Sequence, residues 1–265
     1  MKKAILVATI GAMTLGVNAG DWGKAPVGKA PIEECIDLGG EISVGYATDY
    51  YFHGVYWAED NAWADVNYTF DGLAVPVTVG ATYVNSWNPV NFDQLDVYAK
   101  AALGTFAGFD TTLGYTYHLF PENSVGEFGE ISLGLRRSLG FADLVLGTNY
   151  MTGNRLLGES DGWYHQVGLE KSFAITDNIS LVLAGGAGYL DGVINLAVSS
   201  GQGNHGWNHY YARASLPIQL NCRATLTPFV GYENRDGAVS VAGGGFTNIA
   251  DENNVYSGIS LNVTF

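Results

Sequence analysis

The sequence predicts an all-β fold, a transmembrane antiparallel up-and-down β-barrel of about twelve strands with short periplasmic turns and longer extracellular loops. Three observations predict it. Apolar and polar residues alternate with period two from Glu41 onward, and helical spacing is hard to find. Tight turns alternate along the chain with connections that are mostly longer and polar. Aromatic residues gather at both ends of the predicted strands, where a bilayer meets water.

The alternation is clearest in the segment 109–120. Phe109, Leu113 and Tyr115 lie on one face of this predicted strand, whereas Asp110 and Thr112 lie on the other. A wall with lipid outside and a polar lumen inside requires this arrangement. Segments of this kind follow one another at 41–57, 62–70, 73–86, 93–105, 109–120, 127–137, 141–151, 162–173, 178–190, 207–220, 223–235 and 254–265.

The connections fall into two classes, which alternate along the chain. Tight turns are expected at 71–72, 107–108, 138–140, 175–177 and 221–222. Longer polar loops are expected at 86–92, 121–126, 152–161, 191–206 and 236–253, and only the first loop, 58–61, is short. Turns on one side and loops on the other are typical of outer-membrane barrels, whose turns are periplasmic. We expect the two longest loops to limit the mouth.

Aromatic side chains are sorted by their position along the strands. Tryptophan and tyrosine fall mainly at the loop ends, and phenylalanine falls at the turn ends. We expect both groups to form belts at the two membrane interfaces. The loop-end group includes Trp57, Trp63, Trp87, Trp163, Trp207, Tyr50, Tyr51, Tyr117, Tyr150, Tyr189, Tyr210 and Tyr256, and the turn-end group includes Phe70, Phe106, Phe109, Phe141, Phe173 and Phe265.

The chain begins with an expected export signal. Met1-Lys2-Lys3 precedes an apolar stretch that ends at Val17-Asn18-Ala19, where small residues suit a signal peptidase. We therefore expect a signal peptide over 1–19, a periplasmic N-terminal arm over 20–40 and the outer-membrane barrel over 41–265. The expected location is the bacterial cell outer membrane. The expected partners are its lipid, the barrel assembly machinery and small hydrophilic solutes.

Composition excludes two other classes of protein. The formal net charge is -14, with 12 Lys+Arg against 26 Asp+Glu, so a nucleic-acid partner is not expected. A hydrophobic content of 47% argues against disorder. The 36 glycines, about twice ordinary usage, suit a curved wall or an open lumen.

The segment 45–55 (Gly-Tyr-Ala-Thr-Asp-Tyr-Tyr-Phe-His-Gly-Val) resembles the first-strand signature of the TorF-type porin family of uncharacterised Gram-negative outer-membrane β-barrel proteins. Segments 64–68 and 95–99 and the ending 261–265 add to the resemblance. It implies a barrel and a pore, and it supplies no known substrate or catalytic residue. His53 stands where the family usually has arginine.

Alternation predicts which charged side chains face the lumen. Acids and bases are mixed there, as expected in a narrow barrel whose interior charges pair. One hypothesis is a polar channel for small hydrophilic solutes. The other is a salt-bridged interior that does not conduct. The candidate pore-lining residues are Asp49, Asp65, Asp96, Lys100, Glu130, Arg136, Glu170, Arg213, Arg223, Glu233 and Arg235.

Three further residues are assigned structural roles. Cys35 and Cys222, the only two cysteines, are both expected at the periplasmic end, where an oxidising compartment favours a disulfide; two unrelated thiols are the alternative. The terminal Phe265, after alternating apolar residues, resembles the signal that the barrel assembly machinery reads. An ordinary apolar C-terminus is the alternative.

Catalysis has little support in the sequence. The histidines His53, His118, His165, His205 and His209 are scattered, and no His-Glu-x-x-His spacing occurs. No enzyme activity, cofactor or metal is therefore expected. The leading hypothesis is passive diffusion of small hydrophilic solutes through a narrow charged lumen. The alternatives are a closed structural or adhesive barrel whose extracellular loops bind a partner, and a lipid-modifying enzyme that would use His165.

Overall fold

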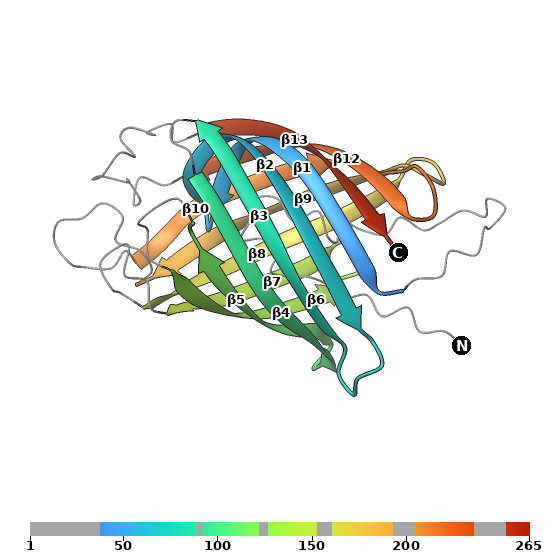
Figure 1. Ribbon diagram of the computed structural model, residues 1–265, viewed down its shortest axis with the longest axis horizontal. Helices are drawn as coiled ribbons and strands as arrows, with labels where there is room; N and C mark the ends of the chain where they lie inside the picture. The colour runs from blue at the N-terminus through green and yellow to red at the C-terminus, as the bar shows by residue number, and fades with distance from the viewer. Residues whose placement is uncertain (1–37, 89–91, 122–126, 153–160, 193–204, 236–252) are drawn as a thin grey trace.

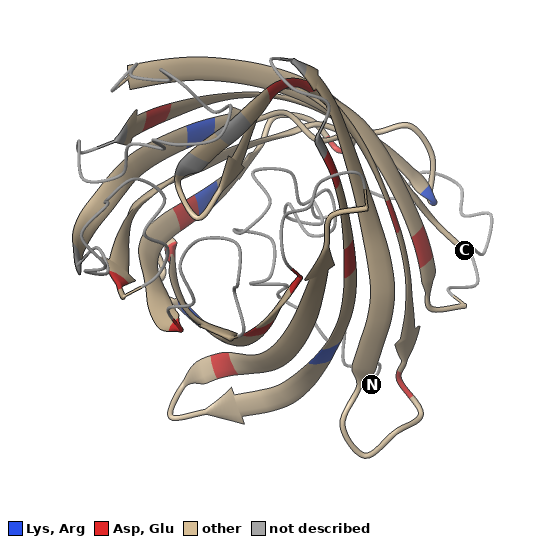
Figure 2. Ribbon diagram, turned by 60° about the vertical axis from the view of Figure 1, so that its left-hand side comes forward, with Lys and Arg blue, Asp and Glu red and all other residues tan. Residues whose placement is uncertain are grey.

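The computed structural model describes residues 38–88, 92–121, 127–152, 161–192, 205–235 and 253–265. They form one antiparallel sheet that closes into a barrel, with a ring of strands around a common interior (Figures 1 and 2). The strands are β1 Gly40–Phe52, β2 Val55–Phe70, β3 Val77–Asn88, β4 Phe92–Phe106, β5 Phe109–Leu119, β6 Phe128–Ser138, β7 Asp143–Thr152, β8 Gly162–Ala174, β9 Ser180–Asp191, β10 His205–Ser215, β11 Ile218–Gln219, β12 Ala224–Arg235 and β13 Asn253–Thr264.

The ring has twelve strand positions, because β10 and β11 share one of them. Both pair with β12, and the chain between them passes through Pro217, which has no N–H to give to a ladder. The Leu216 N–H donates to the Pro228 carbonyl at 2.9 Å across this break. Pairing of β1 with β13, from Glu41↔Thr264 to Ala47↔Gly258, closes the barrel. The predicted fold class is confirmed.

The first hairpin differs from its prediction. We expected a strand over 41–57 and a loop over 58–61, but β1 ends at Phe52 and β2 begins at Val55. The turn is His53-Gly54, with φ of 51° and 74°. A two-residue turn with both φ positive suits a twisted hairpin, and glycine adopts it without steric cost. His-Gly lacks the usual Asn-Gly signature, which explains why the sequence did not reveal the turn.

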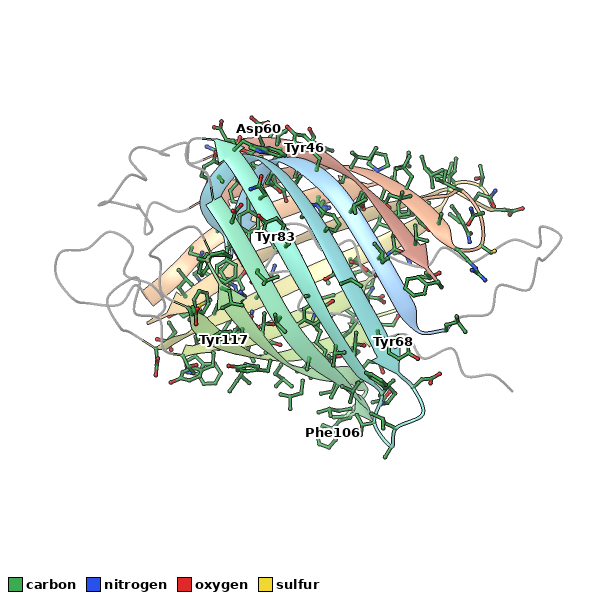
Figure 3. All side chains as sticks on the ribbon, in the orientation of Figure 1. Tyr46, Asp60, Tyr68, Tyr83, Phe106 and Tyr117 are labelled. Carbon is green, nitrogen blue, oxygen red and sulfur yellow. The ribbon has the colours of Figure 1, made fainter. Side chains whose placement is uncertain are left out.

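The two faces of the wall follow the predicted alternation. Inward positions carry buried polar side chains, such as Ser43, Thr82 and Gln166. Outward positions carry exposed apolar ones, including Tyr68, Tyr83, Phe106 and Tyr117, which Figure 3 shows on the outer side of the wall. A water-soluble protein would reverse this order. A closed ring with an apolar outer face is suited to lipid, because every strand finds a hydrogen-bonding partner. The chain is by fold and surface a bacterial outer-membrane β-barrel.

None of the described residues forms a helix long and apolar enough to cross a membrane.

The aromatic belts are present, but some predicted members belong elsewhere. Trp87, Trp163 and Trp207 are exposed toward the loop ends, and Phe106 and Phe141 are exposed at the turn ends. The belt assignment is wrong for four others, which are buried inside the barrel: Trp63, Tyr50, Tyr51 and Tyr256. Trp63 and Tyr256 occupy inward positions of β2 and β13, and Trp63 packs over Gly45. Strand position alone did not separate a belt residue from an interior one.

Candidate functional site

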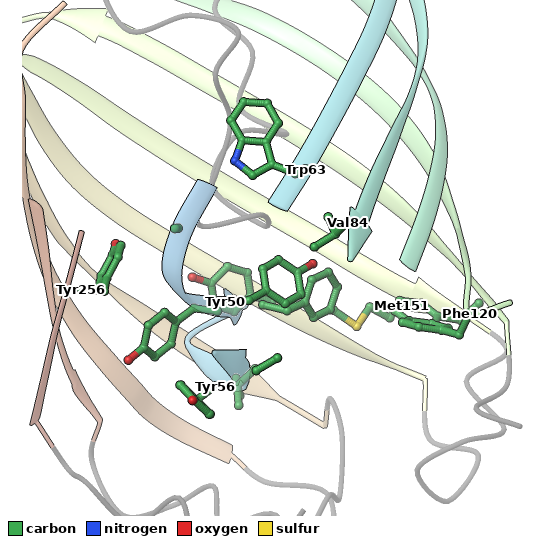
Figure 4. Packing of buried hydrophobic residues seen from close by; sticks show 14 of the residues in the cluster. Tyr50, Tyr56, Trp63, Val84, Phe120, Met151 and Tyr256 are labelled. Atoms are coloured by element: carbon green, nitrogen blue, oxygen red, sulfur yellow. The ribbon is translucent and has the colours of Figure 1, made fainter. Parts of the chain in front are cut away.

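Residues 48–58 depart from the barrel wall and lie inside it. Among the described residues, the β1–β13 ladder stops at Ala47↔Gly258 and the β2–β3 ladder stops at Glu59↔Asn88. Beyond these points β1 and β2 continue to pair with each other, and their register shifts between Tyr50 and Tyr51. We call residues 48–58 the interior hairpin. Figure 4 shows Tyr50 and Tyr56 of this hairpin surrounded by wall strands.

Burial confirms that the interior hairpin is covered on both faces. Tyr50, Tyr51, Phe52 and His53 are consecutive, and each is 3% exposed or less. A strand in the wall would leave every second side chain facing lipid. Because no side chain in this run is exposed, protein surrounds the segment on both sides. The hairpin lies at the loop end of the barrel, which is the extracellular end in this class of protein.

One side of the interior hairpin contacts strands β4, β5 and β6. The Tyr50 hydroxyl donates to Gln94 Oε1 at 2.8 Å. His53 Nε2 lies 2.7 Å from Glu130 Oε2. The Phe52 ring packs edge-on against His118 and Phe128, with centroids 5.3 and 6.0 Å apart. These contacts fix one side of the tip against β4, β5 and β6.

The other side of the tip contacts β8 and β10. Asn208 Nδ2 donates to the His53 carbonyl oxygen at 2.8 Å. The His53 ring lies 4.3 Å from the Tyr164 ring between centroids. A Cβ on Gly54 would overlap the His209 ring, so only glycine allows this close approach. The tip is therefore held from two opposing sides.

The base of the interior hairpin is bound to β13. Asn254 Nδ2 donates to the Tyr51 hydroxyl at 2.7 Å and to Asp49 Oδ1 at 2.9 Å. The rings of Tyr51 and Tyr256 lie 5.3 Å apart. The hairpin thus contacts strands spread around much of the ring, and it occupies part of the interior cross-section at the extracellular end.

Two buried histidine–carboxylate chains form the seat of the hairpin. In the first, His118 Nδ1 lies 2.6 Å from Asp96 Oδ1, and His118 Nε2 lies 3.8 Å from Glu130 Oε2. In the second, His209 Nδ1 lies 2.9 Å from Glu233 Oε2, and the Tyr164 hydroxyl lies 2.8 Å from His209 Nε2. Asp96, Glu130 and Glu233 therefore each have a histidine beside them, which offsets part of their desolvation cost.

Toward the turn end, the interior holds a second group of charges. Arg136 bridges Asp143 and Glu170, with Nη2 to oxygen distances of 2.7 and 2.5 Å. Asp65 accepts hydrogen bonds from Thr82 at 2.6 Å and from Tyr98 at 3.0 Å. Lys100 and Arg213 lie over the rings of Tyr98 and Phe229. Acids and bases thus pair inside the barrel, as the sequence predicts.

Nine of the predicted pore-lining residues lie at inward positions, and their role in lining a pore stays a prediction. Inward positions hold Asp49, Asp65, Asp96, Lys100, Glu130, Arg136, Glu170, Arg213 and Glu233.

Two of the predicted pore-lining residues differ from this group. Arg223 is not on the interior wall, because it lies in the exposed turn between β11 and β12. The side chain of Arg235 is outside the described residues, as are the predicted signal peptide, most of the arm and most of the long loops. The structure describes only one of the two cysteines of the predicted disulfide. Cys222 lies in the β11–β12 turn and is not a free cysteine, whereas Cys35 is outside the described residues.

Sequence reasoning missed the group that holds the interior hairpin. Tyr50, Gln94, His118, Asn208 and His209 were not recognised as interior contacts. The available signal was the run of aromatic residues at 50–52, which breaks the period of two just before a glycine. In the described part of the chain, no group of three histidine, cysteine or acidic side chains is arranged to hold a metal ion.

No family model and no curated protein matches the chain. Among solved structures, it is similar to the COG4313 outer membrane channel from Pseudomonas putida F1, with a TM-score of 0.55 and 11% identity over 89% of this chain and 99% of that one. It is also similar to the KdgM porin in complex with disordered oligogalacturonate, with a TM-score of 0.50 and 9% identity over 85% and 99% of the two chains. These likenesses show the fold. The barrel implied by the TorF-type resemblance is confirmed, and membership of that family stays a prediction.

Proposed function

We propose that this barrel is an outer-membrane channel for passive diffusion of small hydrophilic solutes through a narrow, charged lumen. The observation that carries the proposal is the polarity of the inner face along the strands. Thr78, Thr112, Ser132 and Gln166 continue the polar surface beyond the charged groups described above. Polar groups are costly next to lipid and useful beside a hydrated path. The similarity of the fold to a porin and an outer-membrane channel supports this proposal.

The charge of the interior favours cations over anions of the same size. Acidic side chains outnumber basic ones at the described inward positions, and Arg136 is already shared by two carboxylates. The excess of acids produces a negative potential, which raises the local concentration of cations. The inward acids are Glu41, Asp49, Asp65, Asp96, Asp110, Glu130, Asp143, Glu170 and Glu233, and the inward bases are Lys100, Arg136 and Arg213.

Conductance across a planar bilayer tests the proposal directly. The refolded full chain should give stepwise single-channel currents. Under a KCl gradient, the reversal potential should have the sign expected of a channel that prefers potassium to chloride. An absence of steps at any voltage, both in the full chain and in a chain that lacks residues 49–59, would reject the channel. Steps with chloride selectivity would leave the channel in place and reject the role of the acidic excess.

A second candidate is a closed structural or adhesive barrel whose extracellular loops bind a partner. One observation favours it: the interior hairpin occupies space in the lumen at the loop end. The same bilayer recordings separate the two candidates, because a closed structural barrel conducts no ions with or without this hairpin.

We also propose that the barrel is not an enzyme. His165 faces outward on β8, where its Nδ1 lies 2.7 Å from Thr148 Oγ1. A hydrolase of this kind would need a nucleophile, a base and a third orienting group. In the described residues, no carboxylate is placed to orient His165. Phospholipid hydrolysis by the purified protein that disappears in His165→Ala would overturn this assignment.

We propose roles for the C-terminal residue and for the two cysteines. Phe265 lies at the seam, where its backbone N–H donates to the Gly40 carbonyl at 2.9 Å, and its ring packs over Gly40. We propose that the assembly machinery recognises this terminus, so Phe265→Asp should reduce the amount of heat-modifiable barrel in the membrane. A Cys35–Cys222 disulfide would clip the arm to the β11–β12 turn. Two free thiols in non-reducing mass spectrometry would exclude it.

A further inference from the structure

We propose that the interior hairpin is a displaceable plug, which closes the extracellular half of the lumen and is held closed mainly by Glu130 and Asn208. The inference rests on the proposed channel function, since a plug has meaning only where solutes pass. It goes further by assigning the closing element, its seat and the contacts that must break.

The interior hairpin forms a unit of its own. Its two arms pair through Tyr50↔Ala58, Tyr51↔Tyr56 and Phe52↔Val55, so they hold each other. The ladder that closes the barrel lies below it and ends at Ala47↔Gly258. The hairpin can therefore change position while the closing β1–β13 ladder stays intact.

Separate side-chain contacts attach the tip of the hairpin to the wall. Side chains of the distant wall hold it: Glu130 contacts the His53 ring, Asn208 donates to the His53 carbonyl, and Gln94 accepts from Tyr50. Such contacts break one at a time, unlike the cooperative ladder of a sheet. Two of the three converge on His53, so this residue is the point at which the tip is fixed.

In the closed position, several buried polar atoms have no hydrogen-bond partner among the described protein atoms. Within the described residues, His53 Nδ1, His118 Nε2 and Asn208 Oδ1 are in this state. Buried polar atoms without partners cost free energy, and hydration would recover it. All three lie where the tip meets its seat. Their exposure to water on displacement would offset part of the lost contact.

The local backbone places bends at the tip and at the base of the hairpin. Asp60, where the β2 arm rejoins the wall, has φ of 50°, and Gly54 at the tip has φ of 74°. The register shift between Tyr50 and Tyr51 adds a bulge, which re-aims the strand. These features direct the hairpin inward and leave its base as the natural hinge.

Truncation of the hairpin is the decisive experiment. Residues 49–59 are replaced by Asn-Gly, which joins Thr48 to Asp60 through a two-residue turn suited to antiparallel strands. Folding is checked by heat-modifiable migration on gels and by circular dichroism. In planar bilayers, the truncated barrel should show a single-channel conductance several-fold larger than that of the full chain.

A point variant tests the contact between Glu130 and His53, and it keeps the proposal testable if the truncated barrel does not fold. Glu130→Gln keeps the shape of the side chain and removes its charge beside His53, so large openings should become several-fold more frequent. Asp110→Asn is the matched control, because Asp110 is an inward acid at the turn end, bonded to Thr105 and remote from the tip. Its opening frequency should equal that of the wild type.

The outcomes separate the plug from the channel. If the full chain and the truncated chain conduct equally, the hairpin does not close the lumen, and the channel function stands. If neither conducts, both the plug and the channel are rejected. If Glu130→Gln and Asp110→Asn change the opening frequency alike, Glu130 has no specific role in holding the tip.

Discussion

Strand β5 and the interior hairpin contain similar residues in different environments. In β5, exposed Leu113 and Tyr115 alternate with buried Thr112, Gly114 and His118. In the interior hairpin, Tyr50 to His53 are all buried, although they too belong to an extended chain. Both segments are rich in aromatic residues, so composition does not distinguish them.

The difference shows what the alternation of apolar and polar residues indicates about the surroundings of a strand. Alternation marks a strand between two solvents, lipid on one side and the polar lumen on the other. Loss of alternation in an extended segment marks protein on both sides. The hairpin therefore packs as the core of a soluble protein does, whereas β5 packs as a wall. Substitutions in the two regions should therefore differ in their effect on stability.

Phe52→Ala should remove about 3–5 kcal/mol from the free energy of unfolding, because it empties a fully packed aromatic site. Phe106→Ala is the control, since Phe106 is 79% exposed on the outer face. Urea titration in detergent micelles, followed by tryptophan fluorescence, measures both. Equal losses would mean that the hairpin does not pack as a core.

Leu113→Lys should cost about 2–4 kcal/mol in a lipid bilayer, because it places a charge on the lipid face of β5. Thr116→Lys should cost far less, because position 116 faces inward and lies directly opposite Glu130 on β6. Urea titration in lipid vesicles compares them. A larger loss for Thr116→Lys would invert the assignment of the two faces.

Gly54→Ala should cost about 1–3 kcal/mol and shift the tip, because the methyl group meets the His209 ring at a positive φ. Gly140→Ala is the matched control, since Gly140 has φ of 85° and a Cβ there has nothing within 4 Å. Thermal unfolding of the two variants gives the comparison. If Gly54→Ala matches the wild type, the tip does not approach β10 closely in the membrane.

Tyr50→Phe should cost about 0.5–1.5 kcal/mol, the net contribution of one hydrogen bond. Tyr117→Phe removes a hydroxyl bonded to Glu127 at an exposed position and should have a smaller effect. The same urea titration measures both. Indistinguishable stabilities for Tyr50→Phe and the wild type would show that the Gln94 contact does not hold the hairpin.

The wall of the barrel was predictable from sequence because its determinants are local. Each strand shows its two environments in its own alternation, and short turns separate the strands in pairs. The inward positions of Asp65, Glu130 and Arg136 followed from the same pattern. Arg223 was misplaced because alternation gives a face only where a strand exists, and this residue lies in a turn.

The interior hairpin was decided by tertiary structure. Its contacts join residues far apart in the chain: Tyr50 and Gln94 are 44 positions apart, His53 and Glu130 are 77, and His53 and Asn208 are 155. No local pattern encodes which of these side chains meet. Only the closure of the ring brings the distant strands around one tip, so the same residues that suggested an ordinary first hairpin form the interior of the barrel.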